Sequence, residues 1–316
     1  MRVDEHTFYL DDSPVYYRSA DASGMPNLYL HGIPTSSDDW LDFLARAGGI
    51  APDLAGFGRS GKGGHLDYSL AGLADFVARL MDHLEIDQVK VVGHDWGAAV
   101  ALTFAARHPD RLARLTLINP PPLTEPPGEW PRVLRLWRAR GVGELVMGAT
   151  TKGLLARTLR RGSVRPDAWP DARVAAVWEQ FDQGTQRAIL RLVRSAADDV
   201  IGVGGSRPST GLATDPPTDL PTGPPTGLPT HPPTDLPTGP PTRWPPGPPM
   251  HPPERPGAAA TTILWGEDDP WYPPALADAY AARLPGATVE RVAGAGHWPW
   301  LDRPEVVDRV ASLLEG

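Results

Sequence analysis

The sequence of 316 residues contains no cysteine, which excludes disulfide bonds, thiolate metal sites and a cysteine nucleophile. It has no run of about 18 apolar residues, the length that a membrane-spanning helix needs. The start, MRVDEHTFYL, has no apolar core of signal-peptide length. A net charge of −8 gives no general attraction to nucleic acid or to an anionic membrane. We therefore expect a cytoplasmic protein with no nucleic-acid partner and no membrane contact.

Short β-branched runs alternate with segments of helical periodicity, which is the pattern of an α/β fold with a mostly parallel, doubly wound sheet. Two alternating runs within residues 6–17 flank a turn and predict an antiparallel hairpin. Further strands are expected at 27–30, 49–54, 112–119, 261–265 and 288–292, and helices at 69–84, 274–284 and 304–314.

An insertion between the strands at 112–119 and 261–265 predicts helices alone. The candidate helices are 130–140, 142–161 and 172–196. Residues 130–197 carry 13 Lys and Arg against 5 Asp and Glu. This basic excess indicates either solvated helix faces or a preference for anionic substrates.

A low-complexity stretch at 215–254 is built from tetrads such as DPPT, DLPT, GPPT and HPPT. It has too little apolar surface to form a core, and its prolines lack the N–H donors of a helix or sheet. We expect extended chain that behaves as a linker. The repeats are either an expansion in a surface loop or a ligand for a proline-recognising partner.

The segment QVKVVGHDWGAAVALTF, residues 88–104, predicts a strand, a sharp turn and a helix. Gly93 and Gly97 flank Asp95 at the spacing of a nucleophile elbow, in which small neighbours let the backbone bend and lift one side chain above the sheet. The alternative is that Asp95 only caps the following helix. A carboxylate is ionised at neutral pH and suits displacement at a saturated carbon, which gives an ester between enzyme and substrate.

Three candidate catalytic side chains, Asp95, Asp269 and His297, each follow a predicted strand. In open parallel sheets, sites form beyond the carboxyl ends of the strands. Nucleophile, acid and base in this order is also the chain order of α/β-hydrolases. The segments His31-Gly-Ile-Pro34, Gly93-His-Asp-Trp-Gly97, Trp265-Gly-Glu-Asp-Asp-Pro270 and Gly294-Ala-Gly-His297 together resemble the aspartate-nucleophile branch of that superfamily, which includes haloalkane dehalogenases and epoxide hydrolases.

The resemblance implies a hydrolase core at 1–122 and 258–316, a helical cap at 123–200 and a Pro/Thr-rich linker at 201–257. It implies that Asp95 is the nucleophile and that His297 is the base that activates water. Asp269 would orient His297, with Asp268 as the competing candidate for that role. The backbone N–H groups of Ile33 and Trp96 would form the oxyanion hole. The partners would be a small organic substrate and water, with no metal and no cofactor.

The leaving group is the open question. In dehalogenases that resemble this chain, a Trp at the position of Trp96 holds the departing halide with its indole N–H. Ile33 has no side-chain donor where many of them place a second one, so a cap tryptophan would have to serve, and the available ones are Trp130, Trp137, Trp169 and Trp178.

Epoxide hydrolases usually carry cap tyrosines, and no tyrosine occurs between Tyr68 and Tyr272. The resemblance therefore favours cleavage of carbon–halogen bonds. The alternatives are an epoxide hydrolase, an esterase-like hydrolase and a non-catalytic interaction protein that uses the Pro/Thr repeats.

Overall fold

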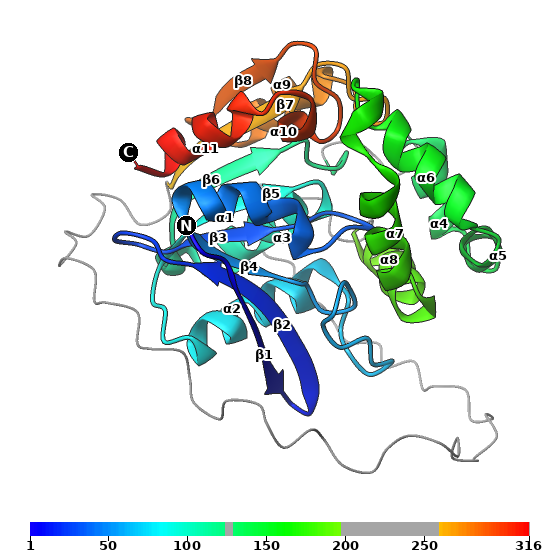
Figure 1. Cartoon of the computed structure of the whole chain (residues 1–316), viewed down its shortest axis with the longest axis horizontal. Helices are drawn as coiled ribbons and strands as arrows, with labels where there is room; N and C mark the ends of the chain where they lie inside the picture. The colour runs from blue at the N-terminus through cyan, green and yellow to red at the C-terminus, as the bar shows by residue number, and fades with distance from the viewer. Residues whose placement is uncertain (124–128, 197–258, 316) are drawn as a thin grey trace. The chain divides into compact units, whose positions relative to one another are not determined.

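An eight-stranded sheet lies at the centre of the part of the chain that the computed structural model describes, residues 1–123, 129–196 and 259–315 (Figure 1). The strand order is β1-β2-β4-β3-β5-β6-β7-β8. Strands β1, β2 and β4 pair antiparallel, and all other neighbours are parallel, which confirms the predicted fold class. The strands are β1 (Asp4–Leu10), β2 (Ser13–Ala20), β3 (Asn27–Leu30), β4 (Gly49–Pro52), β5 (Val89–His94), β6 (Leu112–Ile118), β7 (Ala260–Gly266) and β8 (Thr288–Val292).

Helices cover both faces of this sheet because the chain reverses its direction of travel across it. The step from β3 to β4 runs one way, and the steps from β4 to β5 and onward run the other way. Since parallel crossovers are right-handed, the helix of the first step lies on one face and those of the later steps lie on the opposite face. These helices are α1 (Leu41–Ala47) for the first step and α2 (Leu70–His83), α3 (Trp96–Arg107) and α9 (Ala275–Arg283) for the later ones.

The final helix, α11 (Glu305–Glu315), packs on α1 and so returns to the first face. The middle of the sheet is buried between the two helical layers, and β3 and β4 have every residue buried. Helix α3 is rich in alanine and almost wholly buried, which brings its backbone close to the strands beside it. This close packing fixes the position of the turn between β5 and α3.

The insertion between β6 and β7 is helical, as predicted, and Figure 1 shows its helices in green, gathered to one side of the sheet. They are α4 (Arg132–Arg138), α5 (Val142–Gly148), α6 (Lys152–Arg161), α7 (Asp171–Gln180) and α8 (Gln183–Ser195). We call these five helices the cap. All described residues belong to one contact unit. The boundaries proposed for cap and core stay a prediction, and the Pro/Thr-rich linker lies outside the described residues.

Two of the predicted cap helices are wrong in length, because each is two helices. The segment 142–161 is broken before Thr151, whose side chain accepts a hydrogen bond from the backbone N–H of Leu154 and so starts α6. The segment 172–196 is broken at Asp182, whose carboxylate accepts from the N–H of Thr185 and starts α8. Capping side chains satisfy the free amides at the start of a new helix, and hydrophobic periodicity does not reveal them.

The other differences are small. Strand β4 ends at Pro52, two residues earlier than predicted, and the short helix α10 (Pro299–Asp302) was not predicted. Short 3-10 turns occur at Ser37–Trp40, Pro109–Arg111 and Pro166–Ala168. Within the described residues, none of the helices has the length and apolar character needed to cross a membrane.

Candidate active site

Asp95 occupies a strained turn between the end of β5 and the start of α3. Its φ of 49° and ψ of −123° lie outside the regions that non-glycine residues prefer, at a cost of about 1–3 kcal/mol. A Cβ added at Gly93 would lie 2.6 Å from the Cα of Ala98, and one at Gly97 would lie 2.2 Å from the carbonyl oxygen of Leu30. The two glycines are therefore needed for this turn, as the spacing around Asp95 predicts.

The two carboxylate oxygens of Asp95 have different partners. Oδ2 accepts a hydrogen bond of 3.1 Å from the backbone N–H of Ile33. Oδ1 accepts one of 3.0 Å from the hydroxyl of Tyr272 and lies 3.8 Å from Nε2 of His297. Only 2% of Asp95 is exposed. Oδ1 is thus the oxygen that faces the reactive groups of the site.

Burial raises the pKa of Asp95 to about 6, because water no longer solvates the charged form. The charge of His297 opposes this rise, and hydrogen bonds from the backbone amides of Ile33 and Trp96 and from Tyr272 oppose it further. The two amides are those of the predicted oxyanion hole. Because a pKa of about 6 is still below 7, Asp95 is mostly ionised at neutral pH although it is buried.

His297 and Asp269 form a hydrogen-bonded pair. Nδ1 of His297 lies 2.7 Å from Oδ2 of Asp269, and the carboxylate can only accept, so Nδ1 carries the proton. Burial acts to lower the pKa of His297, but the charges of Asp269 and Asp95 outweigh burial, and the pKa is raised. The neighbouring Asp268 is exposed. Of the two competing acids, the structure therefore brings Asp269 to the histidine.

Asp269 is held by neighbours that the sequence did not single out. The Nδ2 group of Asn119 donates a 2.7 Å hydrogen bond to Oδ2, next to the imidazole. The backbone N–H groups of Trp271 and Tyr272 donate to Oδ1, at 2.8 and 3.1 Å. All the described partners of this carboxylate are donors, and together they fix it in place.

The loop that carries His297 is tied to the cap. The backbone N–H of His297 donates a 2.7 Å hydrogen bond to the carbonyl of Gly162, which follows α6. The buried carboxylate of Asp302 accepts from the N–H groups of Gly296, Val164 and Arg165. Asp302 thus links the histidine loop to the chain that leaves α6. Cap and core are in contact at the position of the candidate base.

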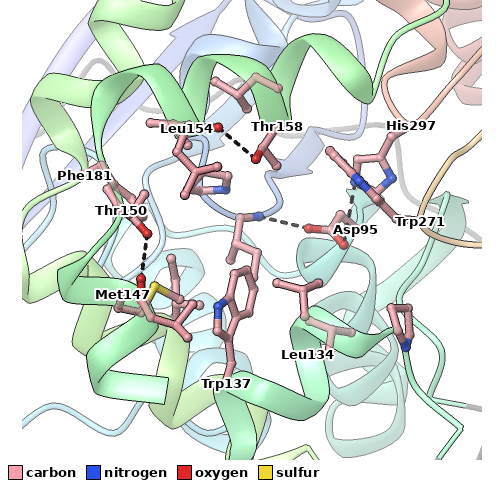
Figure 2. A pocket seen from close by; sticks show the side chains of 18 of the residues that line it. Asp95, Leu134, Trp137, Met147, Thr150, Leu154, Thr158, Phe181, Trp271 and His297 are labelled. Carbon is pink, nitrogen blue, oxygen red and sulfur yellow. Dashed lines mark hydrogen bonds and ion pairs between the residues drawn. The ribbon is translucent and has the colours of Figure 1, made fainter. Parts of the chain in front are cut away.

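A cavity of about 260 Å³ opens above Asp95 and His297 and is lined mainly by apolar side chains of the cap. Figure 2 shows cap side chains across the cavity from the two candidate catalytic residues. The labelled apolar ones are Leu134, Trp137, Met147, Leu154 and Phe181. Thr150 and Thr158 also line it, but the hydroxyl of Thr150 donates to a carbonyl of α5 and that of Thr158 to a carbonyl of α6. Such a cavity suits a small apolar substrate.

The tryptophans proposed for the leaving group differ in position. Trp96 is 1% exposed and is not among the described residues that line the cavity, while its indole N–H has no hydrogen-bond partner in the described part of the chain. Of the four cap candidates, Trp137 lines the cavity. Tyr272, for which the sequence predicts no role in the site, also lines the cavity and contacts Asp95.

His31 and His94, the histidines of two of the quoted segments, have backbone partners. Nε2 of His31 accepts from the N–H of Leu54 at 2.9 Å, and Nε2 of His94 donates to the carbonyl of His297 at 2.8 Å. Burial lowers the pKa of both histidines, so both are neutral. In the described ranges, no group of three or more His, Asp or Glu side chains is placed to hold a metal ion.

Comparison with known proteins finds matches over part of the chain. The family described as alpha/beta hydrolase fold matches residues 28–144. A haloalkane dehalogenase from Mesorhizobium japonicum is 38% identical over 143 residues, which are 42% of this chain and 46% of that protein. An epoxide hydrolase 2 from Siraitia grosvenorii is 38% identical over 125 residues, 38% of this chain and 40% of that protein. The chain thus spans less than half the length of either relative.

A solved structure shares this fold. The crystal structure of a loop variant of the haloalkane dehalogenase DbeA from Bradyrhizobium elkanii superposes with a TM-score of 0.71 at 22% identity, covering 100% of this chain and 97% of that one. The described part of the chain has the α/β-hydrolase fold. The relatives that the chain matches over part of their length include haloalkane dehalogenases and epoxide hydrolases.

Proposed function

We propose that the protein is a hydrolase that works through a covalent ester on Asp95 and that its substrates carry a carbon–halogen bond. The observation that carries the proposal is a buried, ionised carboxylate on a strained turn, with Oδ1 directed to His297 at the floor of an apolar cavity. The names of the relatives support a hydrolase of this kind.

In the first half-reaction, Oδ1 of Asp95 attacks the carbon that bears the halogen. The oxygen–carbon bond forms, the carbon–halogen bond breaks, and the halide leaves with the electron pair. Oδ2 keeps its hydrogen bond from the N–H of Ile33. Because the carboxylate is already ionised, this step needs no base. The apolar walls exclude water and leave Asp95 poorly solvated, which favours its attack on carbon.

In the second half-reaction, Nε2 of His297 takes a proton from a water molecule, which attacks the carbonyl carbon of the ester. The negative charge that develops on Oδ2 is stabilised by the backbone N–H groups of Ile33 and Trp96. Collapse of this intermediate breaks the bond to the alkyl oxygen, which takes the proton from His297 and leaves as the alcohol, and Asp95, regenerated as the acid, gives its proton to solvent. Asp269 stabilises the imidazolium formed at His297, and Asn119 holds Asp269 in place.

Two experiments test this pathway. In a single turnover in ¹⁸O-water, the product alcohol should carry ordinary oxygen and the label should enter Asp95, because water attacks the carbonyl of the ester. His297→Gln should still form the ester, so that intact-mass spectrometry shows the protein plus the alkyl group. Labelled alcohol in the first turnover, together with no adduct in His297→Gln, would mean direct attack by water and would refute the ester pathway.

The leaving group is tested at Trp96. Its buried indole N–H has no hydrogen-bond partner among the described residues, which supports a role in halide binding, although Trp96 is not among the described residues that line the cavity. Trp96→Phe keeps an aromatic ring and removes the donor. Turnover of 1-bromobutane and 1-chlorobutane should fall by about 10²-fold or more, by analogy with loss of one oxyanion donor. Rates that stay unchanged for halides while esters are hydrolysed would argue for an esterase-like activity.

Opening of an epoxide is the second candidate function, and Tyr272 is the observation that favours it. The absence of cap tyrosines argues against this chemistry at the level of the sequence. The structure nevertheless has a tyrosine hydroxyl at the cavity floor, supplied by the core. A panel of haloalkanes, epoxides and esters, assayed for halide, diol and acid release, separates the candidates.

A further inference from the structure

Tyr272 touches the reacting atom, and the pathway above leaves it without a role. Its hydroxyl donates a 3.0 Å hydrogen bond to Oδ1 of Asp95, the oxygen that would attack the substrate, and its side chain lines the cavity. Tyr272 is 5% exposed. A tyrosine placed there for packing alone would not need to aim its only polar atom at the nucleophile.

The position of this hydroxyl is fixed from three sides. The backbone N–H of Tyr272 donates to Oδ1 of Asp269, and its carbonyl accepts a 3.3 Å hydrogen bond from the indole of Trp265. Its ring meets the imidazole of His297 edge-on, with 5.2 Å between the ring centroids. The phenol therefore has little freedom apart from rotation of the O–H bond.

That one rotation is what the reaction requires. Before attack, the negative charge is on Oδ1 and attracts the phenol proton. As the ester forms, Oδ1 loses its charge and becomes a weak acceptor, while charge appears on the departing atom. The structure thus points to an O–H donor beside the nucleophile that can turn from Oδ1 to the leaving atom as the charge moves.

We propose that Tyr272 is a further catalytic residue, which donates to the leaving atom while Asp95 attacks. The proposal rests on the proposed function, because it requires the ester on Asp95. It also identifies the second donor that Ile33 cannot supply, and it places that donor in the loop after Asp269 instead of in the cap.

The proton balance differs between the two kinds of leaving atom. A halide leaves with the electron pair of the broken bond and needs only a hydrogen bond, so Tyr272 keeps its proton. The oxygen of an epoxide leaves as an alkoxide and takes the proton, which makes Tyr272 a phenolate. Hydrolysis of the ester then regenerates Asp95 as a carboxylic acid, and its proton returns to the phenolate across the 3.0 Å contact. Both cycles are closed with water as the only co-reactant.

The test compares leaving atoms in a background where only the first half-reaction occurs. The His297→Gln protein and the His297→Gln/Tyr272→Phe protein are each mixed with 1-chlorobutane, 1-bromobutane, 1-iodobutane and 1,2-epoxybutane. The rate of adduct formation is followed by intact mass. Tyr272→Phe should slow the epoxide by about 10²-fold or more and the iodide by only about threefold, since a basic oxygen gains far more from the donor than a large, diffuse halide. The slowing of 1-chlorobutane and 1-bromobutane should lie between these two values, with the chloride slowed more than the bromide.

Tyr280→Phe is the matched control. Tyr280 is a buried tyrosine of α9 whose hydroxyl donates to the carbonyl of Pro121, and it is not among the described residues that line the cavity. Removal of the Tyr280 hydroxyl should leave the four rates of adduct formation, and the ratios between them, unchanged. Thermal unfolding of both Phe variants shows whether either loses stability.

The outcomes separate this proposal from the proposed function. Equal slowing with all four probes, or no slowing with any of them, would mean that Tyr272 has a structural role and would overturn its assignment as a donor while leaving the ester pathway intact. Absence of an adduct with every probe in folded His297→Gln would overturn the proposed function, and the role of Tyr272 with it. Selective slowing of the epoxide and then the chloride supports both.

Discussion

Acidification should slow both proposed half-reactions, because ester formation needs a charged Asp95 and ester hydrolysis needs a neutral His297. Burial raises the pKa of Asp95 to about 6, so its reactive, ionised form is lost as the pH falls through 6. At pH 5 only about a tenth of the protein holds an ionised Asp95, and ester formation should be roughly tenfold slower than on its plateau above pH 7. Rapid-quench intact-mass measurements between pH 5 and 8 give this rate directly.

The pKa of His297 should change in the course of the reaction. In the resting protein, the charges of Asp269 and Asp95 raise the pKa of His297 above its ordinary value, against the effect of burial. Esterification removes the charge of Asp95, so the pKa of His297 should fall when the ester forms. Any proton that His297 carries in the resting protein is then released as the halide leaves, and a pH indicator in weak buffer should record it in the first turnover.

The His297→Gln variant tests the coupling between the two groups. It lacks the positive charge that lowers the pKa of Asp95, so the acid limb of ester formation should move to higher pH than in the wild type. A limb that stays in place, or moves to lower pH, would refute this coupling. A rate of ester formation that does not change between pH 5 and 8 would refute Asp95 as the titrating nucleophile.

Three further predictions concern positioning and the linker. Asp269→Asn should slow ester hydrolysis by about 10³–10⁴-fold in single-turnover assays, as with the equivalent change in a serine triad, whereas the matched control Asp268→Asn alters an exposed side chain and should have little effect. Gly32→Ala places a Cβ 2.6 Å from the Cβ of Asp95, so kcat/KM should fall by about 10²-fold from displacement of the nucleophile. Replacing residues 215–254 by a short flexible linker should leave cooperative unfolding and turnover nearly unchanged, since loop-closure entropy grows slowly with length.

The fold was predictable because its signals are local. Strand β5 is a short run rich in valine, and the turn at Asp95 requires the two glycines that flank it, because a Cβ at either would clash with the backbone. The start of α2 was predictable in the same way, because Ser69 caps it by accepting from the N–H of Gly72. The breaks at Thr151 and Asp182 were missed because the same residue types also occur inside helices.

The candidate site was predictable only in part. Asp95, Asp269 and His297 stand in recognisable segments after strands, and the structure brings them together. Asn119 and Asp302 stand in no such segment. Asn119 reaches Asp269 across 150 positions of the sequence, and Asp302 reaches Val164 across 138. Contacts of this kind follow from how the strand ends and loops are packed, and residue type alone does not reveal them.

The turn after β7 positions Tyr272 in the candidate site. One carboxylate, that of Asp269, directs one oxygen to His297 and the other to the backbone N–H groups of Trp271 and Tyr272. The same side chain thereby sets the tautomer of the base and the position of the phenol that contacts Asp95. A tyrosine three residues after the acid reaches the nucleophile only if the chain turns back at Asp269. The backbone hydrogen bonds to Oδ1 make this turn, so an Asp in this position would support both of the proposed half-reactions.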